Sequence, residues 1–213
     1  MKKLIYQSIV IAFVLSGISC GGNSNEMKEE KPKNTVEAIT QIGEQMKKGS
    51  SDANTKMKER KAKGDTLAMN YKELQKYLPL SIDGYKTGEP NGTSINMQGM
   101  SYSSAEATFK KDNGDHIKVT IIDYNAAYGI YTAATAMWAI GMNVETPEEK
   151  VSGIKMDNEI GGWETFKKKR KDATVTLGVG YRFWVNIEAN NQESTDFIKS
   201  VAKSMRLDDL AKL

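Results

Sequence analysis

The chain is poor in the residues that bind metals and build catalytic pairs. Its 213 residues include one cysteine, Cys20, and one histidine, His116. Zinc sites of the common types need several cysteine or histidine ligands, and Cys/His or Ser/His nucleophile pairs need a suitably placed histidine. Since the strand pattern puts His116 on an exposed face beside a hairpin tip, we expect no metal site, no catalytic histidine and no cofactor.

Aromatic residues are missing from residues 20–64, which carry ten basic and seven acidic side chains. A segment of this composition cannot bury enough apolar surface to offset the entropy that it loses on ordering. The composition of this segment therefore predicts a charged, flexible stalk at residues 20–64, followed by a single domain at residues 65–213. A helix that starts near Thr35 is possible within the stalk, and we expect it to be transient and solvated rather than partner-binding.

A large excess of charge of one sign is also missing. The formal net charge is +3, and removal of residues 1–19 would take away Lys2 and Lys3 and no acidic residue. The remaining chain is then close to neutral, so bulk charge gives it no attraction for polyanions. We expect no nucleic-acid partner.

Residues 1–19 have the order of parts of an export signal. Lys2 and Lys3 come first, a mostly apolar stretch follows, and small residues come last. The apolar stretch is too short for a membrane span, which takes roughly 20 apolar residues. We therefore predict a signal peptide at residues 1–19.

Cys20 directly follows this segment. The residues Ile18-Ser19-Cys20 resemble the lipobox of bacterial lipoproteins, although Gly17 stands where leucine is usual. The resemblance implies that the new N-terminal cysteine carries acyl chains, which anchor stably because each buried methylene contributes about 0.8 kcal/mol. Ordinary secretion with an incidental cysteine is the alternative. Gly21 is not the aspartate that marks inner-membrane retention in some Gram-negative bacteria, which favours the outer membrane.

The rest of the chain predicts an α+β domain. Its pattern is helix, three strands, helix, three strands, helix, which favours a largely antiparallel sheet of about six strands packed against helices. In the central hairpin, a three-residue turn at Asp112-Asn113-Gly114 pairs Phe109 with Ile117 and keeps the apolar side chains on one face. The first helix has Asn70 as its N-cap.

An uncharged run from Ala126 to Val144 begins with a pattern of small residues at helical spacing. Asn125 can cap this helix and Gly141 can end it. A membrane span is disfavoured, because polar residues are scattered through the run and neither flank is basic. We expect a helix that packs closely on the sheet.

Three stretches carry a resemblance to a known group. They are LQKYLPLSIDGYKTGEP, GMSYSSAEATFKKDNGDHIKVTIIDYN and the terminal LDDLAKL. They resemble landmarks of an uncharacterised group of bacterial envelope lipoproteins, over roughly residues 67–213. The order of elements is similar to the PsbP/Mog1-like sandwich, which serves as a binding module in other proteins, and this is an analogy of fold alone. The group has no established activity that the resemblance could imply here.

Two further patterns could suggest chemistry. Ser200 and Lys203 form a Ser-x-x-Lys pattern, but it has no partner motif and lies beside the apolar stripe of the last helix. Asp112, Asn113 and Asp115 could hold a calcium ion, and turn formation explains the same residues without one. We predict no catalytic residues.

Two features remain as candidate binding surfaces. The basic run at residues 167–171 either protects a sheet edge or binds an anionic lipid or glycan. Arg182 and Trp184 are expected on the face opposite Phe183, where a helix covers them or an aromatic platform is exposed. The candidate binding surface is therefore Lys167, Lys168, Lys169, Arg170, Lys171, Arg182 and Trp184.

The favoured interpretation is a lipid-anchored, non-enzymatic protein of the bacterial envelope. Its membrane contact is the lipidated Cys20, and its domain binds an envelope protein, anionic lipid or glycan. The alternative is an envelope hydrolase or transferase that uses Asp, Glu, Lys or Tyr without a metal. A pocket with convergent acids or a perturbed lysine would favour the enzyme.

Overall fold

The computed structural model describes residues 35–97, 100–125, 143–157 and 159–213. The chain divides after Pro32, and all described residues belong to the second unit, Lys33–Leu213. The helical elements are α1 Thr35–Ala62, α2 Tyr71–Leu74, the 3-10 helix η1 Gln75–Tyr77, α4 Asp196–Ser204 and α5 Leu207–Ala211. The strands are β1 Lys86–Thr87, β2 Asn91–Met97, β3 Met100–Lys110, β4 His116–Asp123, β5 Val144–Glu145, β6 Glu149–Asp157, β7 Ile160–Lys167, β8 Asp172–Val179 and β9 Phe183–Ala189.

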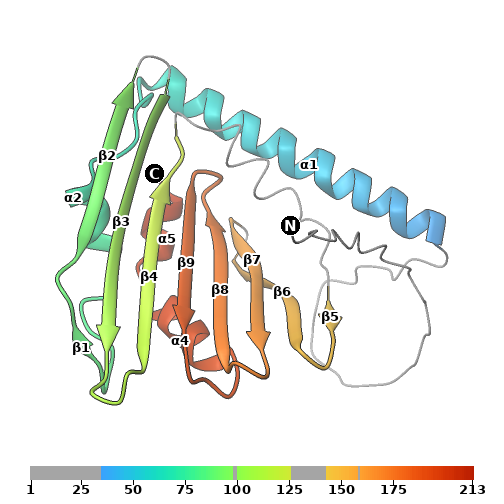
Figure 1. The fold of residues 1–213 in the computed structure, drawn as a ribbon. Coiled ribbons are helices and arrows are strands. Elements are labelled where there is room, and N and C mark those ends of the chain that lie inside the picture. The colour runs from blue at the N-terminus through green and yellow to red at the C-terminus, as the bar shows by residue number, and fades with distance from the viewer. Residues whose placement is uncertain (1–34, 98–99, 126–142, 158) are drawn as a thin grey trace, which may run out of the picture. The chain divides into compact units, whose positions relative to one another are not determined.

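The nine strands form one antiparallel sheet in the order β1-β3-β4-β9-β8-β7-β6-β5 (Figure 1). β2 also pairs with β3, on the same side as β1. The expected α+β class and largely antiparallel sheet are confirmed, but the described residues contribute nine strands to the sheet instead of about six. The additional strands β2 and β5 are mostly exposed, so they lack the alternation of apolar residues that predicts a half-buried strand. In β6, Ile154 and Met156 pack partly buried against the core, and this row is too short to predict the strand.

The register of the central hairpin follows from its apolar residues. Phe109 pairs with Ile117, as predicted, and the next inward pairs are Ala107 with Val119 and Ala105 with Ile121. Gly114 has a positive φ of 92° in the turn, where the Lys111 N–H donates to the Asp115 carbonyl at 2.8 Å. A left-handed residue at this position is typical of the three-residue turn.

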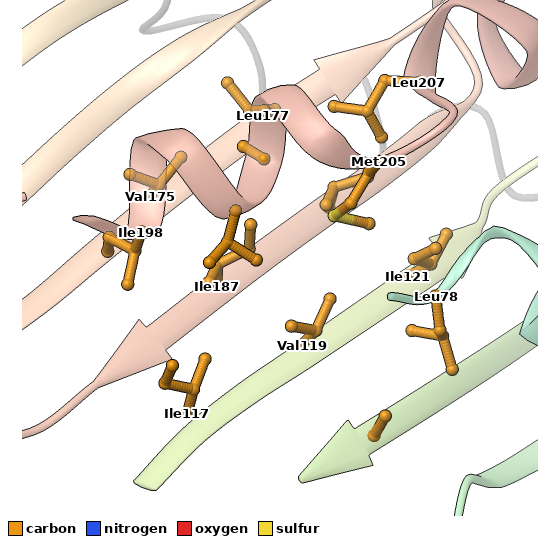
Figure 2. Close-up of a cluster of buried hydrophobic side chains, with 14 of the residues drawn as sticks. Leu78, Ile117, Val119, Ile121, Val175, Leu177, Ile187, Ile198, Met205 and Leu207 are labelled. Carbon is orange, nitrogen blue, oxygen red and sulfur yellow. The ribbon is translucent and has the colours of Figure 1, made fainter. Parts of the chain in front are cut away.

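The core lies on one face of the sheet, which we call the inner face. Alternate residues of β3, β4, β8 and β9 are buried there, among them Ile117, Val119 and Ile187. Helices α4 and α5 add Ile198, Leu207 and Leu210, and the segment around α2 adds Leu74 and Leu78 (Figure 2). The Asn70 side chain caps α2 by accepting from the Lys72 N–H, as expected from the sequence.

Helix α1 differs from the expected stalk. It occupies Thr35–Ala62, and its last turns contact the sheet domain through Lys56 and Arg60. Ala53 is buried, and the Lys56 ammonium lies 3.0 Å from a carboxylate oxygen of Glu159. Its contacts with the domain include ion pairs and hydrogen bonds. A helix that docks through polar side chains need not carry an apolar stripe, so the sequence pattern does not predict the docking. The compact unit therefore begins well before residue 65.

Two predictions on helices remain to be placed. The helix expected between Asn125 and Gly141 falls on residues 126–142, outside the described part of the chain. None of the helices in the described ranges is both long and apolar enough to cross a membrane. The predicted C-terminal helix is present as α4, followed by the short α5.

Candidate functional site

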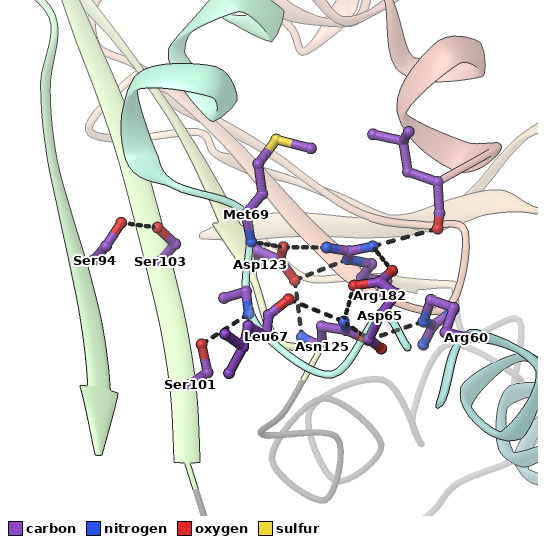
Figure 3. Close-up of polar contacts among 12 residues, drawn as sticks. Arg60, Asp65, Leu67, Met69, Ser94, Ser101, Ser103, Asp123, Asn125 and Arg182 are labelled. Atoms are coloured by element: carbon purple, nitrogen blue, oxygen red, sulfur yellow. Dashed lines mark hydrogen bonds and ion pairs between the residues drawn. The ribbon is translucent and has the colours of Figure 1, made fainter. Parts of the chain in front are cut away.

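A cluster of polar and charged residues, most of them buried, lies where β4 ends and β9 begins (Figure 3). We call it the arginine network, and it consists of Arg60, Asp65, Asp123, Asn125 and Arg182. Isolated buried charges are costly, so such groups persist when each finds a partner of opposite sign and hydrogen bonds. The contacts of each member decide whether the cluster has a free reactive group.

Asp123 and Arg182 form the centre of the network. The guanidinium binds the carboxylate in a bidentate way, with Nε 3.0 Å from Oδ1 and Nη2 2.7 Å from Oδ2. The backbone N–H groups of Asn125 and Met69 donate to the same two oxygens at 2.8 Å each. Asp123 is fully buried and accepts four hydrogen bonds, so both of its oxygens are saturated.

Asp65 and Asn125 extend the network to the segment after α1. Arg182 Nη1 lies 2.7 Å from Asp65 Oδ2. The Asn125 amide donates to Asp65 Oδ1 at 2.8 Å and to the Leu67 carbonyl at 3.1 Å. These bonds hold residues 65–67 against the end of β4.

Arg60 and the C-terminal residue complete the cluster. Arg60 Nε donates to Asn125 Oδ1 at 3.0 Å, and Arg182 Nη1 donates to the Leu213 carbonyl at 3.3 Å. Arg182 therefore binds both carboxylates of the network, and Arg60 joins it through the Asn125 side chain. The network joins the end of α1, the centre of the sheet and the C-terminus, which indicates a structural role.

The network was not predicted, although one signal for it is present in the sequence. Asp123 follows Ile117, Val119 and Ile121 at the period of two that marks an inward-facing row. An acid at the end of a buried row requires a buried partner. The sequence does not show which of its basic residues supplies that partner.

The structure corrects the placement of Arg182. We expected it on the same face as Trp184, opposite Phe183, but its side chain is 5% exposed and binds Asp123 and Asp65. Strand β9 begins at Phe183, and Gly180 and Tyr181 before it have positive φ. The alternation of faces therefore does not extend back to residue 182, and Arg182 is no part of a binding surface.

The basic run at residues 167–171 ends β7 and forms the turn into β8. Its charges are largely balanced by acidic neighbours, with pairs of 2.7 Å between Lys168 and Glu145 and 2.8 Å between Lys169 and Glu148. Arg170 pairs with Asp172 at 2.8 Å and Lys171 with Glu193 at 2.5 Å, while Lys167 ends β7 and is exposed. This balance weakens the case for an anionic ligand, because little net positive charge remains to attract one.

The hairpin tip holds its polar groups in internal contacts. The Asp115 carboxylate accepts from the Asn113 and Asn191 amides at 3.0 Å and 2.9 Å, and these bonds lower its pKa below the ordinary value, with Asn113 the larger cause. Asp112 pairs with Lys86. No group of three or more His, Cys, Asp or Glu side chains that could hold a metal occurs among the described residues. Turn formation accounts for the tip without calcium.

His116 and Ser200 are both exposed, and their contacts are local. The His116 backbone N–H donates to the Asn190 side chain at 2.6 Å, and its ring lies 3.4 Å from the Gly114 carbonyl. The Ser200 hydroxyl donates to the Phe197 carbonyl of its own helix at 2.6 Å. His116 therefore lies on the surface beside the hairpin tip, and Ser200 bonds within helix α4.

The outer face of the sheet, opposite α2, α4 and α5, carries a row of large side chains. Trp184 pairs in register with Ile122 on β4 and with Gly178 on β8. Its ring lies 6.3 Å from that of Trp163 on β7 in a T-shaped arrangement. The two rings meet diagonally across β8, where Gly178, the partner of Trp184, has no side chain, and Trp163 pairs with Thr176. We call this pair the indole pair, and both rings are half-buried.

A second ring pair continues this row toward the β2 edge. Tyr102 on β3 lies 5.8 Å from Tyr124, and Tyr102 pairs in register with Ile95. Trp184 was expected on this face and is found there; Trp163 was not singled out, because a strand containing two glycines gave no clear alternation.

No family model matches the chain, and neither a curated protein nor a solved structure was found to be similar to it.

Proposed function

We propose that this protein is a lipid-anchored, non-catalytic binding protein of the bacterial cell envelope, held by Cys20 at the outer membrane. The order of residues 1–20 supports the anchor, since a basic start, an apolar stretch and small residues precede the cysteine. The proposal includes the expected relation to envelope lipoproteins and the expected likeness of the domain to the PsbP/Mog1-like sandwich.

The indole pair is the observation that carries the binding role. Tryptophan supplies a large, rigid contact area with a polar N–H, and it is enriched among the residues that dominate binding energy. Trp163 and Trp184 lie on the outer face, while the helical layer of α2, α4 and α5 lies on the inner face. The outer face therefore carries a pair of half-buried aromatic rings on a rigid sheet.

The arginine network supports binding over catalysis. A carboxylate that acts as a base or nucleophile needs an oxygen within reach of a substrate, and both oxygens of Asp123 are saturated by four donors. Asp65 is engaged by Asn125 and Arg182. These acids stabilise the fold and are not poised for proton transfer.

The experiment is capture from an envelope extract by the immobilised protein, with the captured proteins quantified by mass spectrometry. Trp184→Thr should lose most of the capture of any specific partner, because it removes an aromatic ring and keeps a residue suited to a strand. Lys169→Ala in the basic run is the matched control and should keep it. Unfolding in urea establishes that both variants fold.

If capture survives Trp184→Thr and fails with Lys169→Ala, the basic run rather than the indole pair is the binding surface. Capture that neither variant changes would contradict the role of the outer face.

A further inference from the structure

The two edges of the sheet are protected to different degrees. At one edge, β5 is two residues long, and β6 beside it carries Glu149, Lys150, Lys155 and Asp157. Short strands and charged side chains are the usual protection of an edge against pairing with another chain. The opposite edge is formed by β1 and β2, and the seven residues of β2, NGTSINM, include no charge and no proline.

The free side of β2 presents backbone hydrogen-bonding groups. Alternate residues of an antiparallel strand direct their N–H and C=O groups toward the paired strand and away from it. Within the described ranges β2 pairs with β3 alone, so about half of its backbone groups face away from the sheet. Ile95 is 41% exposed and Met97 58% exposed on the same strand.

We propose that β2 pairs antiparallel with β2 of a second copy of this chain, so that two sheets join into one. A two-fold axis makes such an interface self-complementary, since each copy supplies the same strand. Charge favours this occupant. A neutral strand meets its own copy without repulsion in any register, whereas β6 paired about Gly153 would place Glu149 opposite Asp157. Ile95 and Tyr102 of each copy would extend the row of the outer face across the junction.

The expected strength of this contact points to the membrane as its setting. One seven-residue strand pair buries much less than the roughly 1,200 Å² of a stable interface, so we expect a weak dimer in dilute solution. Confinement raises the effective concentration of the second copy. The strand pairing itself is independent of the proposed function, and only this enhancement depends on the anchor at Cys20.

The test is chemical cross-linking in cells that express the full chain. Ile95→Cys places a thiol on β2, and Val144→Cys places one on β5, where the native residue is 38% exposed. A short bis-maleimide linker is used because the two-fold axis need not pass through residue 95. We expect a cross-linked species of twice the mass with Ile95→Cys. With Val144→Cys, we expect the yield of this species to be no higher than in the parent chain, whose cysteine is Cys20.

A charge on the strand provides the second test. With Thr93→Cys as the reporter, adding Ile95→Lys should reduce the cross-linked species about fivefold, because like charges opposed across a strand pair destabilise it. Adding Ile95→Thr, which is neutral and β-branched, should leave the yield unchanged. Since Ile95 is exposed, both variants should fold, as circular dichroism would show.

The outcomes separate this proposal from the anchor. Fractionation of the same cells reports whether the chain is in the membrane. Equal yields for Ile95→Cys and Val144→Cys would overturn the β2 dimer, wherever the chain is found. A dimer in a chain recovered from the soluble fraction would overturn the anchor and leave the strand pairing in place.

Discussion

At the scale of the residue, Asp123 joins parts of the chain that lie far apart in the sequence. Its carboxylate binds Arg182 from the turn before β9 and the backbone N–H of Met69 before α2. Removing one partner from a buried ion pair leaves the other charge uncompensated, which costs about 3–5 kcal/mol. We predict that Asp123→Ala lowers the free energy of unfolding by about that amount, measured by urea denaturation.

The control for this variant is Glu89→Ala, which removes an exposed acid in the segment before β2. Surface substitutions of this kind usually change stability by less than about 0.5 kcal/mol. Equal unfolding midpoints for the two variants would show that the network contributes little.

Gly114 and His116 provide a second contrast in the hairpin. Gly114 has φ 92°, and no heavy atom beyond its two chain neighbours lies within 4 Å of the position that a Cβ would take. The cost of Gly114→Val therefore comes from backbone conformation alone and should be about 1–2 kcal/mol. His116→Ala, which removes an exposed ring, should cost less than about 0.5 kcal/mol. Denaturant unfolding of both variants checks the prediction, and a larger loss for His116→Ala would contradict it.

The Asp115 carboxyl provides a prediction on pH. Hydrogen bonds from Asn113 and, to a smaller extent, Asn191 lower its pKa. A carboxyl with a lowered pKa contributes stability above the pKa of its unfolded state and loses it as pH falls through the folded value. We predict that Asn113→Ala raises the pKa of Asp115 more than Asn191→Ala does, as measured by NMR titration. A pKa that neither variant changes would contradict these hydrogen bonds in solution.

At the scale of the element, α1 is attached to the domain by its C-terminal turns. Ala53 and Arg60 are buried, and Lys56 pairs with Glu159. We predict that a broad-specificity protease leaves a fragment that starts before Ala53, since a docked helix resists cleavage. In Arg60→Ala the fragment should start near Leu67, because Arg60 links α1 to Asn125. Mass spectrometry of the fragments provides the measurement.

Lys58→Ala is the matched control, because Lys58 is an exposed residue of the same helical segment. Its fragment should have the same start as the parent chain. A parent fragment that starts near Leu67 would show that α1 is not docked in solution.

The elements differ in how far the sequence predicts them. The register of β3 and β4 follows from their apolar residues, since a shift by one residue would expose Ile117 and Val119. β2 has no such constraint, because its exposed side chains are compatible with several structures. The same limit applies to the candidate site. Trp184 could be placed from its strand, whereas Arg182 lies in a turn where the alternation fails, and its partners come from distant segments.

At the scale of the whole molecule, the predicted anchor can be tested separately from the fold. Cys20→Ala should leave the unfolding of the domain unchanged and release the protein from the membrane fraction, because acyl chains on Cys20 would provide its membrane affinity. Immunoblots of washed membranes and soluble fractions measure the distribution. A variant that stays in the membrane fraction after a high-salt wash would contradict the lipid anchor.

The position of β9 in the sheet determines when the sheet can be completed during folding. β9 is the last strand of the chain, yet it lies between β4 and β8, and its register joins Ile117 to Ala189. A chain that is made or exported from its N-terminus first presents β2, β3 and β4 while residues 183–213 are still to come. During that interval β4 has an open edge, and the apolar side of its hairpin lacks α4 and α5. The edge of β4 must therefore stay unpaired, and the hairpin must avoid aggregation, until β9, α4 and α5 have been made.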